Sequence, residues 1–390
     1  IVHLVLARLP DAPPGTKGIS LFIVPKFKTA RDGSMGERNT LSCGSIEHKM
    51  GIKASATCVM NFDGAEGYLI GQANRGLNAM FTMMNTARLA VGLQGLGLIE
   101  RAYQNALFYA RDRLQMRSLS GPTRPDKPAD PLIVHPDIRR MLLTQKAFVE
   151  AGRALTYRAI MLVDAFERST DAEAKKNADD LLGFLTPIVK AVMTELAVEC
   201  TYHALQIYGG HGYIAEWGME QLARDARITT IYEGTTAIQA ADLAGRKIAR
   251  DGGKVLATLI ADMHGDEARL QDSGHATLAA IGARLGASLG HLEAATAALL
   301  EKMRTQPAAG LVVAEPFLKL LATVVGGWLM GKAAQIATQA IAAGSTDPFY
   351  REKIVSAKFY ADHILTRSSG LQATVEADNA LLLELADEAF

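Results

Sequence analysis

Two short segments in the second half of the chain carry residues whose types and spacing could do chemistry. The first is glycine-rich, Gln206-Ile-Tyr-Gly-Gly-His-Gly-Tyr213, and the second is Ile231-Tyr-Glu-Gly-Thr235. Glycine leaves backbone amides open to a ligand, and Glu233 places one carboxylate directly before a flexible Gly-Thr pair. The pattern indicates a base beside a phosphate-bearing cofactor.

Both segments also have a purely structural interpretation. A Gly-Gly-His-Gly turn can simply end a helix, because glycine adopts the left-handed conformation, and a lone Glu near a helix start is commonly a solvated partner of the helix dipole. The spacing around His203 and His211 is not that of a metal site, so we expect satisfied helix-end histidines and no metal. Between the segments, Arg224, Asp225 and Arg227 are expected to form ion pairs that hold the second segment.

The segments, in this order and spacing, resemble the C-terminal helical domain of flavin-dependent acyl-CoA dehydrogenases. The resemblance implies that Glu233 removes the α-proton of an acyl-CoA thioester while the β-hydrogen leaves as hydride to flavin N5, which gives a trans-2-enoyl-CoA. It also implies FAD as the cofactor, an electron-transferring flavoprotein as the electron acceptor, and a homodimer or dimer of dimers. The expected setting is fatty acid β-oxidation.

The same resemblance assigns further site residues. Arg113 matches an Arg that reaches the FAD pyrophosphate across the subunit interface, a task that suits the guanidinium fork. Asn85 stands where many family members have Asp, and Thr235 matches a hydroxyl near the flavin, although it could equally be an N-cap. The expected cofactor contacts are Arg113, Gln115, Gln206, Gly209, Gly210 and Thr235. The expected substrate contacts are Asn85, Arg88, Tyr232 and Gly234.

The elements that must position these residues are mainly helical, after a partial β-domain. Residues 1 to about 71 are rich in strand formers, as in Ile19–Val24 and Thr57–Phe62, and predict an incomplete antiparallel sheet. We expect the end of a middle β-domain over 1–75, a flavin and acyl-CoA helical domain over 76–251, and an extra helical domain over 252–390. The chain begins directly on a strand-like run at Ile1, so we expect a fragment that lacks an upstream part.

The helical region predicts long helices packed closely together. Leu181, Leu185, Ile188, Val192 and Leu196 recur at helical spacing and form one apolar face, and Pro187 is expected to kink or start that helix. The small residues Gly92, Gly95 and Gly97 predict close helix packing. A break at 121–136, with five prolines, predicts a surface connection.

Beyond residue 253 the chain continues with a segment that ordinary acyl-CoA dehydrogenases lack. Breakers at Asp272-Ser-Gly274, Thr305-Gln-Pro307 and Gly344-Ser-Thr-Asp-Pro348 divide it into a predicted bundle of about four helices. The extension resembles the subgroup of the family that carries an additional C-terminal domain.

The composition of the chain narrows the class of protein to which it can belong. The chain has 390 residues, with 41 acidic and 41 basic side chains, so no overall charge favours nucleic acid or an anionic membrane. Cys43, Cys58 and Cys200 predict buried, reduced thiols. The apolar run Leu320–Gly331 is too short to span a bilayer and predicts a buried helix. With no visible signal peptide, we expect a cytoplasmic protein without a membrane span.

Three other functions fit parts of the sequence. An acyl-CoA oxidase shares the chemistry but passes its electrons to oxygen. An adaptive-response flavoprotein of the same fold binds DNA, although no basic patch is evident here and Glu233 is present. The extension alone could be a helical interaction module.

Overall fold

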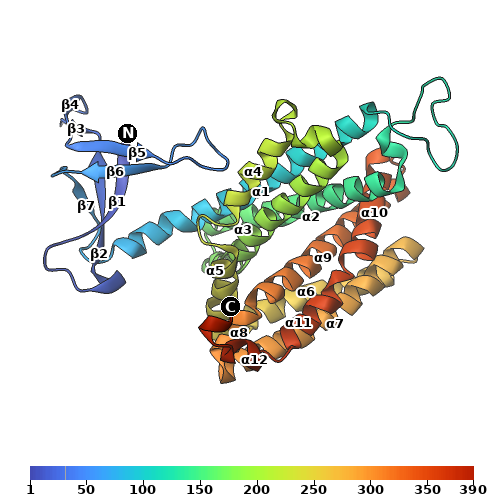
Figure 1. The fold of residues 1–390 in the computed structure, drawn as a ribbon. Helices are drawn as coiled ribbons and strands as arrows, with labels where there is room; N and C mark the ends of the chain where they lie inside the picture. Colours follow the sequence, from blue (N-terminus) through green and yellow to red (C-terminus); the bar gives the residue numbers. More distant parts are fainter. Residues whose placement is uncertain (31) are drawn as a thin grey trace. The chain divides into compact units, whose positions relative to one another are not determined.

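A computed structural model describes residues 1–30 and 32–390 of the chain. The chain divides into two compact units, residues 1–88 and 89–390 (Figure 1). The first unit contains the strands and the beginning of the long helix α1, Gly76–Asp112, which continues into the second unit. The second unit is helical, as the sequence predicts.

The strands of the first unit pair only in antiparallel fashion among the described residues. β2 pairs with both β1 and β7, while β3 pairs with β4 and β5 with β6. The predicted strands Ile19–Val24 and Thr57–Phe62 are confirmed as β2 and β6. The bounds are β1 Val2–Arg8, β2 Ile19–Pro25, β3 Phe27–Thr29, β4 Met35–Arg38, β5 Leu41–Ile46, β6 Cys58–Phe62 and β7 Tyr68–Ile70.

The remaining helices follow one another with short breaks. The α-helices are α2 Pro136–Arg168, α3 Ala172–Tyr208, α4 Met219–Thr229, α5 Thr236–Ala241, α6 Lys254–Gln271, α7 Ala276–Thr305, α8 Pro307–Val312, α9 Ala314–Ala342, α10 Pro348–Phe359, α11 Arg367–Glu376 and α12 Ala380–Glu384. Short 3-10 turns are η1 Gly15–Gly18, η2 Leu132–Val134, η3 Gly209–Tyr213, η4 Ala215–Trp217, η6 Ala249–Asp251 and η8 Asp387–Ala389. Two π-helical turns are η5 Asp242–Ile248 and η7 Tyr360–Ile364.

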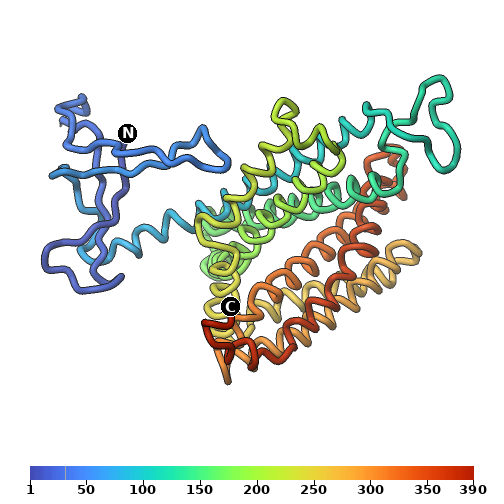
Figure 2. Tube along the Cα trace, in the orientation of Figure 1, coloured from blue at the N-terminus to red at the C-terminus, as the bar shows by residue number. Residues whose placement is uncertain are grey.

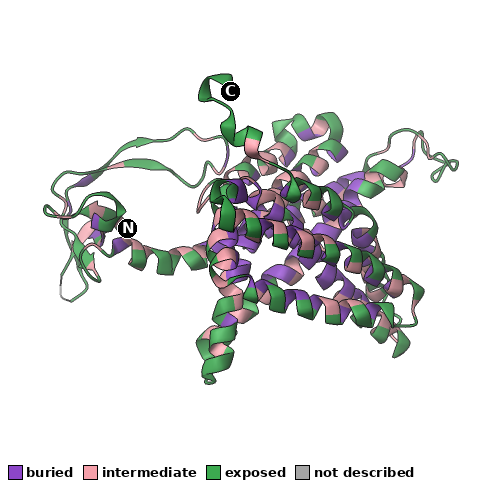
Figure 3. Ribbon diagram, turned by 90° about the horizontal axis from the view of Figure 1, so that it is seen from below, coloured by how far each residue is buried: buried purple, intermediate pink, exposed green. Residues whose placement is uncertain are grey.

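Helices α1, α2 and α3 pack closely because small residues lie at their contacts. A Cβ atom on Gly92 would lie 2.6 Å from Val189 Cγ1, and one on Gly95 would lie 2.7 Å from the Met193 backbone. These two glycines therefore act as predicted, whereas Gly97 faces open space. The buried residues gather on the parts of the helices that lie against other helices (Figure 3).

Helix α3 begins before the residue that was expected to start it. Asp171 caps the helix by accepting a hydrogen bond from the Glu173 amide, at 2.9 Å. Pro187 lies inside the helix and is buried, so the expectation that it might start the helix is wrong. The Thr186 hydroxyl bonds to the Leu182 carbonyl, at 2.7 Å. A threonine hydroxyl that bonds to the carbonyl four residues before it often bends a helix.

The C-terminal region forms the predicted bundle. Its four long helical stretches are α6, α7, α9 and the nearly continuous run from α10 to α11, and they are separated at the predicted breakers. The run Leu320–Gly331 lies in α9 and is largely buried, as expected. Two stretches, Ala172–Tyr213 and Ala314–Ala342, are long and apolar enough to cross a membrane. However, 61% and 72% of their most apolar windows are buried within the protein itself, as in core helices of soluble proteins.

A buried carboxylate, Asp266, joins α6 to α9. It accepts hydrogen bonds from Trp328 Nε1 at 2.7 Å and Lys332 Nζ at 2.8 Å, and it pairs with Arg269. Burial raises the pKa of the Asp266 carboxyl, but the bonds from Lys332, Arg269 and Trp328 outweigh burial, so its pKa is lowered overall. The ionised form therefore stabilises the fold above the ordinary aspartate pKa, and this stability is lost as the pH falls.

We expect Asp266→Ala to lower the free energy of unfolding by about 1–3 kcal/mol, because the buried Trp328 N–H loses its acceptor. Urea unfolding at neutral pH measures the loss, which should shrink as the pH falls below 4. The matched control is Glu301→Ala, which removes an exposed pair with Arg304 and should cost less than about 0.5 kcal/mol. Equal losses in the two variants would contradict the prediction.

The cysteines differ in part from the expectation. Cys200 is fully buried, as predicted, but Cys43 and Cys58 are exposed, and all three are free thiols. The two exposed cysteines lie on the paired strands β5 and β6. Their sequence context is strand-like in both cases, and nothing in the residue pattern distinguishes the covered face of such a short sheet from the open face.

Candidate functional site

Glu233 lies on a two-residue left-handed turn between α4 and α5. Glu233 has φ +55° and Gly234 has φ +93°, a region that side chains other than glycine rarely adopt. A Cβ atom on Gly234 would lie 2.5 Å from Gln239 Nε2, so the position requires glycine. Backbone strain of this kind persists only where the surrounding structure enforces it.

Two buried side chains enforce the turn through its carbonyl groups. Lys190 Nζ donates to the Gly234 carbonyl at 2.6 Å, and Gln239 Nε2 donates to the Glu233 carbonyl at 3.3 Å. Both Lys190 and Gln239 are fully buried. With the two carbonyls held inward, the Glu233 side chain remains half-buried and reachable.

Neither supporting residue was expected from the sequence. Lys190 had a visible signal, because it is a lone cation within the apolar run Ile188-Val-Lys-Ala-Val192, and a lysine is almost never fully buried without a partner. Gln239 follows the motif by six residues but carries no distinguishing pattern.

Tyr232 anchors the same turn to α1. Its hydroxyl donates a hydrogen bond to Gln94 Oε1. Burial raises the pKa of the Tyr232 hydroxyl, and the nearby negative charge of Glu233 raises it further, although the Gln94 bond acts in the opposite direction. The predicted substrate residues Tyr232 and Gly234 therefore adjoin the predicted base.

Thr235 is the N-cap of α5, which was one of its two expected roles. Its hydroxyl accepts a hydrogen bond from the Ile238 amide, at 3.3 Å. The neighbouring Thr236 hydroxyl donates to Glu195 Oε1 on α3, at 2.6 Å. Thr235 and Thr236 also line a cleft of about 430 Å³, together with Arg227 and Thr230. A capping Thr can also face a ligand, so the contact of Thr235 with the cofactor stays a prediction.

The glycine-rich segment ends α3 and turns back as η3. Gly209 closes the helix with φ +57°, and a Cβ atom on either Gly209 or Gly210 would meet nothing within 4 Å. Gly212 differs, because its Cβ would lie 2.8 Å from the Leu205 carbonyl oxygen. The first two glycines are thus open to a ligand, whereas Gly212 serves packing.

An aromatic cluster ties this turn to the end of α1. Tyr109 Oη lies 2.9 Å from His211 Nδ1, and the Tyr109 ring stacks on Tyr208 with centroids 4.1 Å apart. His211 in turn stacks on Trp217, at 4.3 Å. His211 is thus a satisfied helix-end histidine, as expected. The cluster brings the exposed Gln206 and the open glycines to the end of α1, where Arg113 follows.

Arg113 and Gln115 begin the connection between α1 and α2, residues 113–135, which starts before the predicted bounds of 121–136 and extends beyond the ends of both helices (Figure 2). Both side chains are exposed. Their backbone is held firmly, because the Arg113 carbonyl accepts from the Leu132 amide at 2.9 Å and the Gln115 carbonyl lies 2.8 Å from His135 Nε2.

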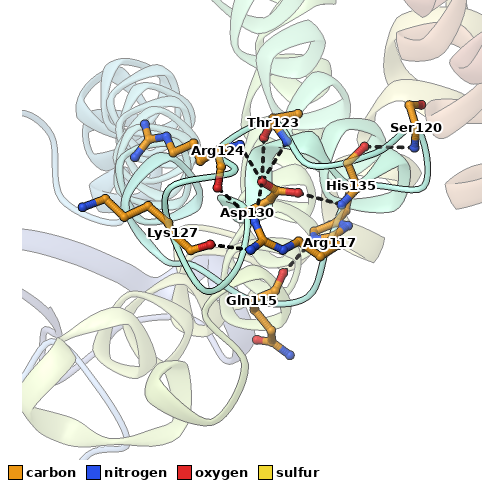
Figure 4. A network of polar contacts seen from close by, with 9 residues as sticks. Gln115, Arg117, Ser120, Thr123, Arg124, Lys127, Asp130 and His135 are labelled. Carbon is orange, nitrogen blue, oxygen red and sulfur yellow. Dashed lines mark hydrogen bonds and ion pairs between the residues drawn. The ribbon is translucent and has the colours of Figure 1, made fainter.

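The connection folds around one carboxylate, Asp130, whose side chain is fully buried (Figure 4). It accepts bonds from the amides of Ser118, Thr123 and Arg124, each at 2.9 Å. The bond from the Ser118 amide is the main cause that lowers the pKa of Asp130, against the opposing effect of burial. The ionised carboxylate therefore orders the connection above the ordinary aspartate pKa, and this order is lost as the pH falls.

We expect Asp130→Ala to make residues 113–135 the first site of proteolytic cleavage, because three backbone amides lose their acceptor. Timed proteolysis with mass spectrometry measures the cleavage rate at each position. The matched control is Asp126→Ala, an exposed carboxylate in the same connection. If the control were cleaved as fast as Asp130→Ala, the ordering role of Asp130 would be wrong.

The predicted residues fall into two groups, one beside the middle of α1 and α3 and the other at the C-terminal ends of these two helices. The turn that carries Glu233 is hydrogen-bonded to Gln94 on α1 and to Lys190 on α3. The glycine-rich turn is hydrogen-bonded to Tyr109 on α1 and directly follows Tyr208, the last residue of α3. At 1.5 Å per residue these anchors lie about 22 Å apart along α1 and about 27 Å apart along α3. One chain therefore does not place the base beside the glycine-rich turn. Asn85 and Arg88 lie on α1 within the first unit.

Two of the minor expectations need correction. His203 lies inside α3, its Nδ1 is buried without a hydrogen-bond partner among the described residues, and burial lowers its pKa, so it is not a satisfied helix-end histidine. Arg224 forms the expected ion pair, but with Glu220 along α4, at 2.5 Å. Arg227 instead donates to the Thr230 hydroxyl at the start of the Glu233 turn.

Family models and relatives match most of the chain. The model for the acyl-CoA dehydrogenase C-terminal domain matches residues 74–248, and the model for an acetyl-CoA dehydrogenase C-terminal-like domain matches residues 256–386. The 3-methylmercaptopropionyl-CoA dehydrogenase of Ruegeria pomeroyi is 45% identical over 95% of this chain and 62% of its own length. The broad-specificity linear acyl-CoA dehydrogenase FadE5 of Mycobacterium tuberculosis is 36% identical over 100% of this chain and 66% of its own length.

Solved structures share the fold. Caenorhabditis elegans ACDH-11, in complex with C11-CoA, and a Bacillus anthracis acyl-CoA dehydrogenase, complexed with FAD, each align with a TM-score of 0.73 at 20% identity. They cover 97% and 98% of this chain, and 61% and 62% of their own lengths. The chain thus spans less than two thirds of these relatives. With the two family models and the identity to curated relatives, the chain belongs to the acyl-CoA dehydrogenase family.

Proposed function

We propose that the protein containing this chain is an FAD-dependent acyl-CoA dehydrogenase that forms trans-2-enoyl-CoA, with Glu233 as the α-proton base. The observation that carries the proposal is the strained turn that Lys190 and Gln239 hold through its carbonyls. A base that abstracts a weakly acidic proton must be positioned accurately, and fixed backbone achieves this. The 45% identity to a named acyl-CoA dehydrogenase supports the same reaction class.

The described residues at the C-terminal ends of α1 and α3 fit FAD. Gly209 and Gly210 leave open space at the end of α3, and no carboxylate of residues 1–30 or 32–390 forms an ion pair with the exposed Arg113. Bare amides and a free guanidinium suit a pyrophosphate. Arg113, Gln206 and Gly210 would hold the cofactor there, and Thr235 would contact it near the base. When bound, FAD supplies the acceptor for the β-hydride.

The residues of the turn supply the other half of the chemistry. The Glu233 carboxylate takes the α-proton, and the electron pair left on the α-carbon forms the new double bond as hydride leaves the β-carbon. The thioester oxygen gains negative charge during this step and needs a hydrogen-bond donor. The Glu233 amide is our candidate, since the turn fixes it together with the carboxylate.

We predict that the whole protein is a homodimer or a dimer of dimers. The base and the phosphate contacts lie about 22–27 Å apart along the helices of one chain, so one cofactor is best served by residues of two chains. Sedimentation velocity of the FAD-loaded protein checks this expectation. A stable monomer with stoichiometric FAD would contradict it.

The test of the proposed function is a flavin spectrum followed by anaerobic mixing with a panel of acyl-CoA thioesters. Bleaching of the flavin by a saturated acyl-CoA, with enoyl-CoA as product, is the expected result. Transfer of the electrons to an electron-transferring flavoprotein supports a dehydrogenase, whereas stoichiometric peroxide identifies an oxidase. Flavin that no acyl-CoA bleaches would refute both. A cytoplasmic role in β-oxidation is the setting that we propose.

A further inference from the structure

A second cavity lies within the helical unit and adjoins the cleft beside Thr235. It has a volume of about 550 Å³ and is bounded by α2, α3, α9, η7 and α11. Helices α2 and α3 lie alongside α9 in this part of the fold (Figure 1). None of the residues assigned to the base, the cofactor or the acyl-CoA lines it. Three residues, Glu195, Val198 and Thr236, line both this cavity and the cleft beside Thr235.

The interior of this cavity is apolar. Its walls include Phe148, Leu155, Met193, Leu318 and Ile364, each at most 3% exposed. Protein interiors are close-packed, and voids larger than a water molecule are few. An apolar cavity of about 150 Å³ already stays dry and binds small hydrocarbons, and ligand pockets span about 300–1,000 Å³. This cavity therefore has the size and lining of a ligand site.

The cavity is elongated along the helices that border it. Its wall on α3 runs from Val192 to Tyr202, and its wall on α9 runs from Leu318 to Gly326. At 1.5 Å per residue these walls are about 15 Å and about 12 Å long. A long apolar wall of this kind fits an extended hydrocarbon chain better than a compact ring.

The charged groups at the rim already have partners. Arg367 pairs with Glu199 at 2.9 Å, and Lys319 pairs with Glu315 at 2.7 Å. Glu195 accepts the Thr236 hydroxyl at 2.6 Å, and the Tyr360 hydroxyl donates to the Thr323 carbonyl at 3.1 Å. A charged head group would have to displace one of these partners and would lose its own hydration. An uncharged head group has no such cost.

We propose that this cavity binds the unbranched hydrocarbon chain of an uncharged amphiphile of the fatty-alcohol class. The site is independent of the proposed dehydrogenation, because it shares no base, cofactor or acyl-CoA contact with it. The chain is held by apolar burial between α3 and α9, and its hydroxyl lies at the rim beside the paired charges.

The test is a titration of the whole protein with 1-decanol, followed by thermal unfolding and calorimetry. Binding to the folded state alone raises Tm as the alcohol concentration rises. Ala322→Phe fills the α9 wall and should weaken binding at least ten-fold, while the exposed Ile336→Phe on the same helix should bind as the original protein does. Ala151→Phe fills the opposite wall on α2 and repeats the test if Ala322→Phe fails to fold.

Four outcomes overturn the proposal. Equal binding by Ala322→Phe, Ala151→Phe and the original protein places the alcohol elsewhere, and no binding at all shows that the cavity is not a ligand site. Tighter binding of decanoate than of 1-decanol shows that the site selects a charge. Sedimentation of the ligand-free variants is measured alongside, because an oligomer that dissociates on filling the cavity identifies a contact between copies instead.

Discussion

Glu233→Gln in the whole protein is expected to keep bound FAD and to bind acyl-CoA, but to reduce its flavin about a hundred-fold to ten-thousand-fold more slowly. The amide has nearly the shape of the carboxylate and can occupy the same left-handed turn, yet it cannot accept the α-proton. General base catalysis raises the rate of such a step by about 10²–10⁴-fold. The turn carries no other carboxylate that can take the α-proton in place of Glu233. Stopped-flow absorbance of the flavin measures the rate directly.

A matched control separates loss of the base from damage to the turn. Glu220→Gln changes a carboxylate on the neighbouring helix α4 that pairs with Arg224, and it should leave flavin reduction nearly unchanged. Near-normal reduction by Glu233→Gln would remove Glu233 from the mechanism. A loss of FAD in that variant would instead show that the turn supports the cofactor.

Lys190→Met should lower kcat about 10–100-fold in the whole protein, with a smaller change in KM. Methionine fills a similar volume but leaves the Gly234 carbonyl without its donor at 2.6 Å, so the strained turn is released. A misplacement of about 1 Å at a reacting group can cost about a hundred-fold in rate. The unsatisfied carbonyl should also lower the free energy of unfolding by about 1–3 kcal/mol.

The control for this variant is Lys176→Met, which changes an exposed lysine on the same helix. It should leave kcat and Tm close to their original values. Lys190 is a positioning residue, so the pH dependence of kcat should shift in Lys190→Met as the surroundings of the Glu233 carboxylate change. A fall in Tm with unchanged kcat and pH profile would show a purely structural role.

Elements with strong local patterns could be predicted from the sequence. Turn residues alone predict the end of α6 before Asp272-Ser-Gly274 and the start of α10 at Pro348. Runs of strand-forming residues predict the strands β2 and β6. The local sequence did not predict those features that depend on contacts between distant parts of the chain. Pro187 stays inside α3 among buried neighbours, and the Nδ1 atom of His203 is buried without a hydrogen-bond partner among the described residues, which the local sequence does not reveal.

The candidate site was predictable in its residues but not in its arrangement. The motif identifies Glu233 and its neighbours, yet nothing in the sequence says that Lys190, which precedes them by more than forty residues, holds their backbone. The order of the segments also places the glycine-rich turn close to Glu233 along the chain. Helix α4 carries the chain away from that turn, and only the folded helices reveal the separation.

The separation of base and phosphate contacts along α1 and α3 has a genetic consequence. If each active site takes its base from one chain and its Arg113 from another, two inactive proteins can complement each other. In a mixed dimer of Glu233→Gln and Arg113→Ala chains, both defects meet in one site, and the other site combines an intact Glu233 with an intact Arg113. Cells that make the two defective forms together would regain activity that neither form has alone.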